Sequence, residues 1–158
     1  MMRGAPLAMG HAPLLRRHTH RWYEGGMKVD PRELTDAERS FVQGLLDHAG
    51  LGNSCFVAGL DDLRVTERCD CGCPSVFFAP AATLVHPEVG NSPLVEASAV
   101  TTNGVPVGVI LWANGSVISG LELYSNAAAP PNTLPEPDTI GQAPPRGAVA
   151  ETWPWIHH

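Results

Sequence analysis

The sequence predicts an α+β domain in which an N-terminal helix, at about 35–49, packs on an antiparallel sheet. Apolar residues recur at helical spacing after Thr35, and the period changes to two from Leu63 onward. Two Asn-Gly pairs, typical of tight β-hairpins, then separate runs of β-branched residues. We therefore expect the sheet to combine a strand or hairpin near 63–79 with a three-strand meander at 94–125.

The two ends of the chain differ in composition from its middle. Residues 1–28 carry five basic side chains and one acidic side chain, and proline is frequent after Tyr124. These features predict a basic disordered leader at 1–28, or an extension upstream of a start at Met27, an α+β domain at 29–125 and a Pro-rich tail at 126–158. A chain of 158 residues is expected to hold one domain rather than two.

Charge and hydropathy exclude some classes of partner. The chain carries a net charge of −6 although its leader is basic, so the folded part is acidic and should repel nucleic-acid phosphates. No run approaches the ~18 apolar residues of a membrane span, and the leader lacks the apolar core of a signal peptide. We expect a soluble, cytoplasmic protein without a membrane partner, in which a disulfide framework is improbable.

The predicted helix has a recognisable start and stop. Thr35 and Glu38 form a T-x-x-E pattern, in which each side chain satisfies the other residue's backbone N–H. Gly50 supplies a left-handed end. One helical face carries the apolar residues Phe41, Val42, Leu45, Leu46 and Ala49.

The register of the meander decides which side chains point inward. If Asn103-Gly104 and Asn114-Gly115 are two-residue loops, Trp112 falls opposite both Val95 and Val117 on one face, with Leu121 on the same face. That face would pack on the helix. The other face would carry Val107, Val109, Leu111, Ile118, Glu96 and Glu122, and it is too apolar to be left in water. We expect a protein partner or a second copy of the chain to cover it.

The segment RCDCGCPSVFF spaces Cys69, Cys71 and Cys73 at every other residue. In a straight strand these thiols would spread over about 13 Å, too far to share a tetrahedral zinc ion. A turn at Asp70–Gly72 would bring them together, and Cys55 or His86 could then be the fourth ligand. Zinc is the first candidate cofactor and Cu(I) the second.

Two other interpretations of the cysteines stay open. Cys71 and Cys73 could form a strained disulfide with Cys69 as the resolving thiol, although Glu67 and Asp70 disfavour reactive thiolates. Alternatively, all three are small apolar side chains that pack under the helix.

The leading functional hypothesis is a small non-enzymatic interaction or regulatory protein that acts through the semi-apolar sheet face. The alternative is a metal-binding or thiol-redox protein that uses the cysteine cluster. A third possibility is an enzyme with Glu96 and Glu122 as paired carboxylates. No phosphate-binding loop, dinucleotide fingerprint or H-E-x-x-H motif supports another chemistry.

The motif R-C-x-C-G-C-P and the later pattern G-x-[IVL]-x-x-L-E-[IVL]-Y resemble a group of small, uncharacterised actinobacterial proteins. The resemblance covers roughly residues 33–138 and leaves the leader outside. It implies a soluble single domain and brings no activity with it.

Overall fold

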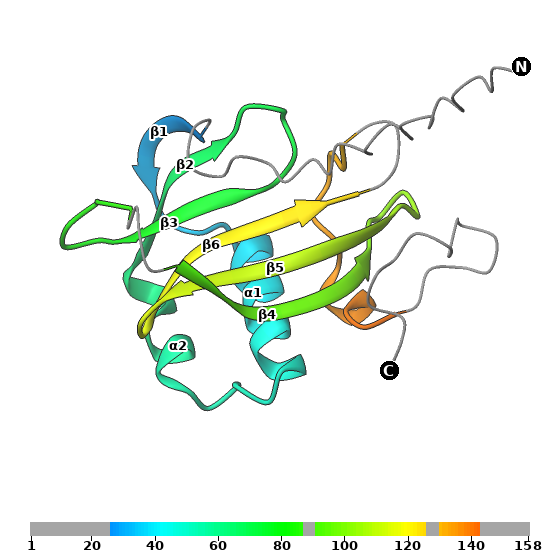
Figure 1. The fold of residues 1–158 in the computed structure, drawn as a ribbon, viewed down its shortest axis with the longest axis horizontal. Coiled ribbons are helices and arrows are strands. Elements are labelled where there is room, and N and C mark those ends of the chain that lie inside the picture. The colour runs from blue at the N-terminus through cyan, green and yellow to red at the C-terminus, as the bar shows by residue number, and fades with distance from the viewer. Residues whose placement is uncertain (1–25, 87–90, 126–129, 143–158) are drawn as a thin grey trace, which may run out of the picture.

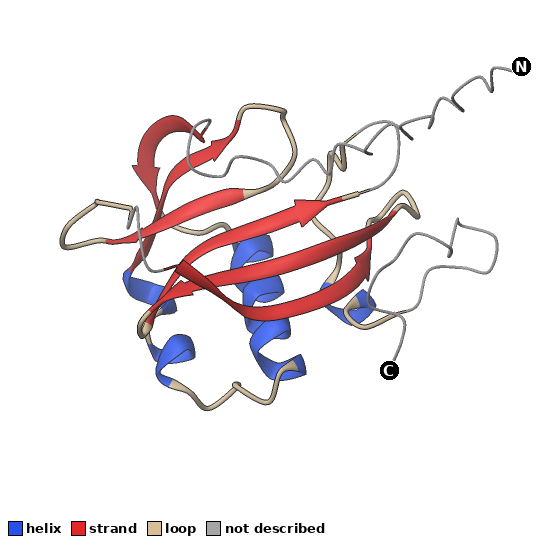
Figure 2. Ribbon diagram, viewed as in Figure 1, coloured by secondary structure: helices blue, strands red, loops and turns tan. Residues whose placement is uncertain are grey.

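The computed structural model describes residues 26–86, 91–125 and 130–142. It contains a six-stranded antiparallel sheet in the order β1-β2-β3-β6-β5-β4, which confirms the predicted sheet, and the described chain is mostly sheet with little helix (Figures 1 and 2). None of the helices in the described segments is long and apolar enough to cross a membrane. The elements in chain order are β1 (Gly26–Arg32), α1 (Asp36–His48), α2 (Cys55–Ala58), the 3-10 helix η1 (Leu60–Asp62), β2 (Leu63–Cys69), β3 (Val76–Pro80), β4 (Asn91–Val100), β5 (Pro106–Asn114), β6 (Val117–Tyr124) and the 3-10 helix η2 (Pro137–Thr139).

Helix α1 begins with the reciprocal cap that the sequence indicated, but it is not the first element, because β1 precedes it. The Glu38 N–H donates to Thr35 Oγ1 at 3.2 Å, and the Thr35 N–H donates to the Glu38 carboxylate at 2.8 Å. Arg32, the last residue of β1, donates to both carboxylate oxygens of Glu38 at 2.8 Å. Burial raises the pKa of Glu38, but the hydrogen bonds from Arg32 and Thr35 outweigh burial and lower it.

The core lies between α1 and one face of the sheet, and Figure 1 shows the helix behind the strands. Phe41 and Leu45 of α1 and Phe78 of β3 are fully buried there. Burying a side chain of this size contributes roughly 1.5–3 kcal/mol, so these contacts stabilise the packing of α1 on the sheet.

The first hairpin of the meander has a longer loop than predicted. The Thr101 N–H donates to the Val105 carbonyl at 2.9 Å, so Thr102, Asn103 and Gly104 form a three-residue loop with Gly104 at a φ of 81°. Three-residue hairpin loops place a left-handed residue at this position, and glycine adopts it without strain. The pairing therefore shifts by one residue, and Val95 lies opposite Leu111 rather than Trp112.

The second hairpin is also displaced. Asn114 pairs with Val117, so the loop is Gly115-Ser116 rather than Asn114-Gly115. A register irregularity follows, with Trp112 opposite Gly120 and Leu111 opposite Leu121. Trp112 and Leu121 consequently lie on opposite faces of the sheet.

These shifts exchange the two faces of β5, and the predicted partner surface is wrong. Its four apolar residues face α1 and belong to the core, with exposed fractions of 0% for Val107, Val109 and Leu111 and 2% for Ile118. Glu96 and Glu122, opposite Ile110 on either side, lie on the face away from α1. A protein partner or second copy stays a prediction to which no surface is now assigned.

The predicted boundaries of the domain need revision where the structure describes them. Residues 26–28, counted with the leader, pair with β2. Residues 130–142, counted with the Pro-rich tail, carry η2, and Leu134 and Ile140 pack on the core. The remainder of the predicted leader and tail lies outside the described residues.

Residues 137–142 also cover part of the outer edge of β4. The Gly141 N–H donates to the Ser98 carbonyl at 2.7 Å, and Thr139 Oγ1 accepts from the Val100 N–H at 3.2 Å and donates to the Val100 carbonyl at 3.0 Å. Further along the same edge stands Pro93, next to a break in the β4–β5 register.

Candidate functional site: a turn with three thiols

The three cysteines lie in and beside the turn that joins β2 to β3. Val65 pairs with Phe78 and Glu67 with Phe77, so Thr66 is an extra residue in β2. A bulge of this kind shifts the alternation of side chains by one. Cys69 therefore falls on the face of Glu67 and not on the buried face of Leu63 and Val65, as uninterrupted alternation would require.

The chain reverses directly after Cys69. The Cys69 N–H donates to the Ser75 carbonyl at 3.1 Å and closes a loop that we call the thiol turn (residues 69–75). Inside the loop, the Gly72 N–H points to the Cys69 carbonyl at 3.5 Å, and Gly72 has a φ of 83°. A side chain other than glycine would be strained in this conformation. The predicted turn at Asp70–Gly72 is present.

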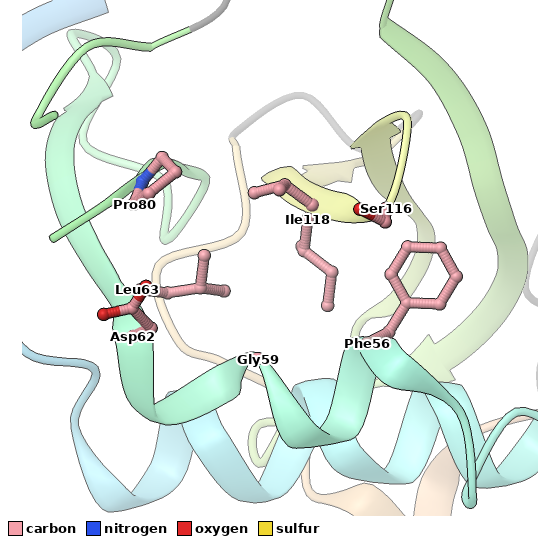
Figure 3. Close-up of a pocket in the computed structure, with 8 residues that line it drawn as sticks. Phe56, Gly59, Asp62, Leu63, Pro80, Ser116 and Ile118 are labelled. Carbon is pink, nitrogen blue, oxygen red and sulfur yellow. The ribbon is translucent and has the colours of Figure 1, made fainter. Parts of the chain in front are cut away.

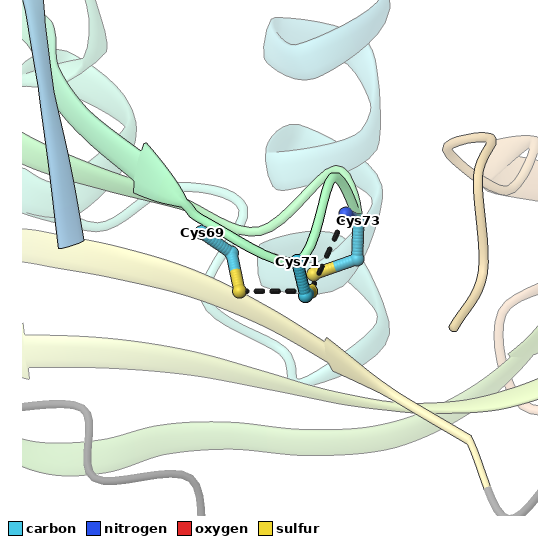
Figure 4. A group of neighbouring side chains, drawn as sticks. All are labelled: Cys69, Cys71 and Cys73. Atoms are coloured by element: carbon cyan, nitrogen blue, oxygen red, sulfur yellow. Dashed lines mark hydrogen bonds between the residues drawn. The ribbon is translucent and has the colours of Figure 1, made fainter. Parts of the chain in front are cut away.

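The turn gathers the sulfur atoms of Cys69, Cys71 and Cys73 within 4.8 Å of one another, which confirms the predicted cluster (Figure 4). Cys69 Sγ and Cys71 Sγ lie 2.9 Å apart, and the Cys73 N–H donates to Cys71 Sγ at 3.4 Å. Metal–sulfur bonds of ~2.3 Å place neighbouring ligand sulfurs about 3.8 Å apart in a tetrahedral site. Small rotations of the side chains would reach that spacing.

The thiols occupy different environments. Cys73 is buried, Cys69 is half-buried and Cys71 is exposed. Burial and the hydrogen bond shared with Cys71 raise the pKa of Cys69 to about 12, and burial also raises the pKa of Cys73. For Cys71, burial opposes ionisation, but the hydrogen bonds from Cys69 and Cys73 outweigh it and lower the pKa. Cys71 is thus the first of the three to become a thiolate.

Ser75 anchors the thiol turn to β6, a role that the sequence analysis missed. Its hydroxyl accepts from the Leu123 N–H at 2.9 Å, donates to the Leu123 carbonyl at 3.3 Å and accepts from the Cys73 thiol at 3.2 Å. The residue is 1% exposed. Ladder pairing between β3 and β6 stops at Val76, so this side chain continues the connection that the backbone no longer makes. No local sequence pattern predicts a contact between residues 48 positions apart.

Neither proposed fourth ligand joins the cluster. The grouping of metal-ligating side chains found in the described chain contains the three thiols without Cys55 or His86. Cys55 belongs to α2, which precedes β2 in the chain, whereas the thiol turn lies at the far end of that strand (Figure 1). The six residue steps from the first to the last residue of β2 span about 20 Å when extended. His86 Nε2 lies 2.9 Å from the Ser119 carbonyl, with its ring edge-to-face on Phe77 at 5.0 Å.

The two glutamates considered as a catalytic pair lie on separate strands with β5 between them. Glu122 Oε2 accepts from Trp112 Nε1 at 3.0 Å. Burial and the charges of Glu96 and Glu122 raise the pKa of Tyr124, which follows Glu122 by two residues on β6. The Trp112 contact gives Glu122 a structural role.

A small pocket of about 80 Å³ lies near α2, lined by Phe56, Leu63, Pro80 and Ile118 among others (Figure 3). It includes neither glutamate of the predicted pair and none of the three clustered thiols. Its volume is well below the ~300 Å³ of typical ligand sites, so it offers no place for a substrate.

No protein-family model matches the chain, and the searches of curated proteins and of solved structures found no significant match. The function must therefore be inferred from the site. Among the described residues, the thiol turn is where soft ligands converge, and such ligands bind zinc or Cu(I) or exchange electrons.

Proposed function

We propose that this protein binds a thiophilic metal ion through Cys69, Cys71 and Cys73. The observation that carries the proposal is the convergence of three sulfur atoms within 4.8 Å on one short turn. The N–H of Cys73 donates to Cys71 Sγ, which is a contact that stabilises a negatively charged sulfur ligand. The proposal takes up the metal-binding alternative and not the interaction hypothesis, because the apolar residues of the supposed partner face lie in the core.

The exposure of the thiols argues against a purely space-filling role. A cysteine that only fills apolar space should be buried, and Cys73 fits that description. Cys71 is exposed and Cys69 is half-buried, although both point their sulfurs at each other. Packing alone gives no reason for this arrangement, whereas a shared ion does.

Metal content of the purified protein tests the proposal. The protein is prepared without chelator under reducing conditions, and its mass is compared under native and denaturing conditions, together with elemental analysis. Cys71→Ser should lose the metal, since it removes one ligand. Cys55→Ser is the matched control, because Cys55 is an exposed thiol outside the cluster, and it should keep the metal. A wild-type protein that stays metal-free after reconstitution with Zn²⁺ or Cu(I) would contradict the proposal.

A redox role is a second candidate, favoured by the 2.9 Å contact between Cys69 Sγ and Cys71 Sγ. Formation of a disulfide between them would release two protons and two electrons, which an oxidant such as a low-molecular-weight disulfide takes up while it is reduced to two thiols. The pair differs from Cys71 and Cys73, which the sequence suggested. A second sample, prepared without reductant and exposed to such a disulfide, tests this role by mass, because the oxidised chain lacks two hydrogen atoms and holds no metal.

A further inference from the structure

We infer that the thiol turn is a three-coordinate site whose preferred ion is Cu(I), rather than the Zn²⁺ that the sequence analysis placed first. This inference rests on the proposed metal-binding function and specifies its ligand. It follows from the number of ligands that the turn supplies, from their placement and from the way the turn is held.

The number of ligands is the first argument. Structural zinc sites are almost always four-coordinate, with all four ligands from protein. The described chain brings three thiols together and leaves both candidate fourth ligands outside the group. Cu(I) is a soft ion that thiolates select and that three of them satisfy, so the turn is complete for copper and incomplete for structural zinc.

The placement of the sulfurs is the second argument. Cys69, Cys71 and Cys73 come from one short loop, so all three sulfurs can contact the same ion without any other segment of the chain (Figure 4). Three bonds of ~2.3 Å in one plane need sulfurs about 4 Å apart, within the 4.8 Å over which the cluster extends. The contact between Cys69 and Cys71 would open by roughly 1 Å from 2.9 Å, which side-chain rotation supplies.

The support of the turn is the third argument. Cys73 is buried and its thiol donates to Ser75, which is itself bonded to both backbone groups of Leu123. Cys71 lies at the exposed side of the cluster. An ion would therefore be seated against the sheet through Cys73 and stay within reach of solvent ligands at Cys71. This placement is better suited to an ion that exchanges between ligands than to a structural ion that stays permanently bound.

Binding has a simple balance. One copper–sulfur bond forms at each cysteine, and each thiol that ligates releases its proton to solvent. The ligand that delivered the copper is released, and copper remains Cu(I) throughout, so no oxidant or reductant is required. Three thiolates beside Asp70 carry several negative charges, and charge alone would favour Zn²⁺ over Cu(I). The number of ligands favours Cu(I) instead, because the turn supplies three and not four.

Competition titrations test the inference on the full chain, reduced and without oxygen. Cu(I) is supplied as its acetonitrile complex against the chromophoric chelator bicinchoninate, and Zn²⁺ is titrated against a zinc chelator. We expect one Cu(I) per chain, displacement of bound Zn²⁺ by an equimolar amount of Cu(I), and an X-ray absorption spectrum with three sulfur ligands. Ser75→Ala should weaken Cu(I) binding by roughly 10–100-fold, because the Ser75 hydroxyl, 3.2 Å from Cys73 Sγ, can donate to the thiolate once the thiol proton has left. Cys55→Ser, outside the cluster, should leave binding unchanged.

The failures can be told apart. Zn²⁺ that is retained against equimolar Cu(I), or a copper spectrum with a nitrogen or oxygen ligand in addition to sulfur, would overturn the Cu(I) inference and leave metal binding intact. Failure to bind either ion would overturn the proposed function as well. Loss of copper in Cys55→Ser would show that the site is assembled from other residues.

Discussion

Replacing Ser75 with alanine should destabilise the domain far more than the same replacement of an exposed serine on a strand would. The Ser75 hydroxyl serves the N–H of Leu123 at 2.9 Å and its carbonyl at 3.3 Å, and the residue is 1% exposed. Water therefore has no room to replace the lost partner. A buried polar group without a partner costs about 1–3 kcal/mol, and the longer bond to the carbonyl contributes less than the shorter one. We expect the free energy of unfolding to fall by about 2–4 kcal/mol.

Urea unfolding of the reduced, metal-free protein measures this change. Ser92→Ala is the matched control, because Ser92 also lies on a strand but is exposed, and substitutions at such positions usually stay within ~0.5 kcal/mol. A loss for Ser75→Ala below about 1 kcal/mol, or one equal to the control, would refute the anchoring role and with it the reason for a fixed position of Cys73.

Three further predictions follow from the core, the helix cap and the thiols. Leu111→Ala should cost about 2–5 kcal/mol of unfolding free energy in urea, because Leu111 is fully buried, whereas a partner-facing residue would leave the isolated chain nearly unchanged. The pKa of Glu38 is lowered in the folded state, so its bond with Arg32 contributes stability above the unfolded pKa of ~4.3 and loses it as the pH falls through the folded value. Glu38→Gln should therefore be less stable than the wild type at pH 7, with a difference that shrinks on acidification, and an equal difference at pH 3 would contradict the pairing. Iodoacetamide should modify Cys71 first among the clustered thiols and Cys73 last, as followed by peptide mass mapping, and the reverse order would contradict the environments assigned to them.

Local signals in the sequence gave reliable information where one short segment decides the structure. The cap formed by Thr35 and Glu38 depends on residues three positions apart, and it is present. The thiol turn likewise depends on Asp70 and Gly72, whose conformational preferences favour a reversal of the chain. Both features could be predicted because no distant contact is needed to form them.

The faces of the meander could not be assigned from the same kind of signal. Asn103-Gly104 fits a two-residue loop and also the end of a three-residue loop, since both accept glycine in the left-handed conformation. The difference is one residue of register, which exchanges the two faces of a strand. Composition could not decide either, because Ile110 and Trp112 make one face of β5 as apolar as the other.

The fourth ligand was mispredicted for a related reason. Cys55 and His86 were proposed on chemistry alone, and their positions depend on how α2 and the segment after β3 pack. The bulge at Thr66 adds a further change, because it moves Cys69 away from the face of Val65. A single extra residue in a strand has no clear sequence signature, although it decides which face of the sheet the Cys69 side chain lies on.

The covered edge of β4 has a consequence for behaviour at high concentration. An unprotected outer strand invites a second molecule to add its own strand, and repetition of that step produces insoluble fibres. Here Thr139 and Gly141 already occupy backbone groups of Val100 and Ser98, and Pro93 has no N–H to offer. A shortened chain that ends before residue 137 would lose this guard, and it should precipitate under conditions in which the full chain stays dispersed.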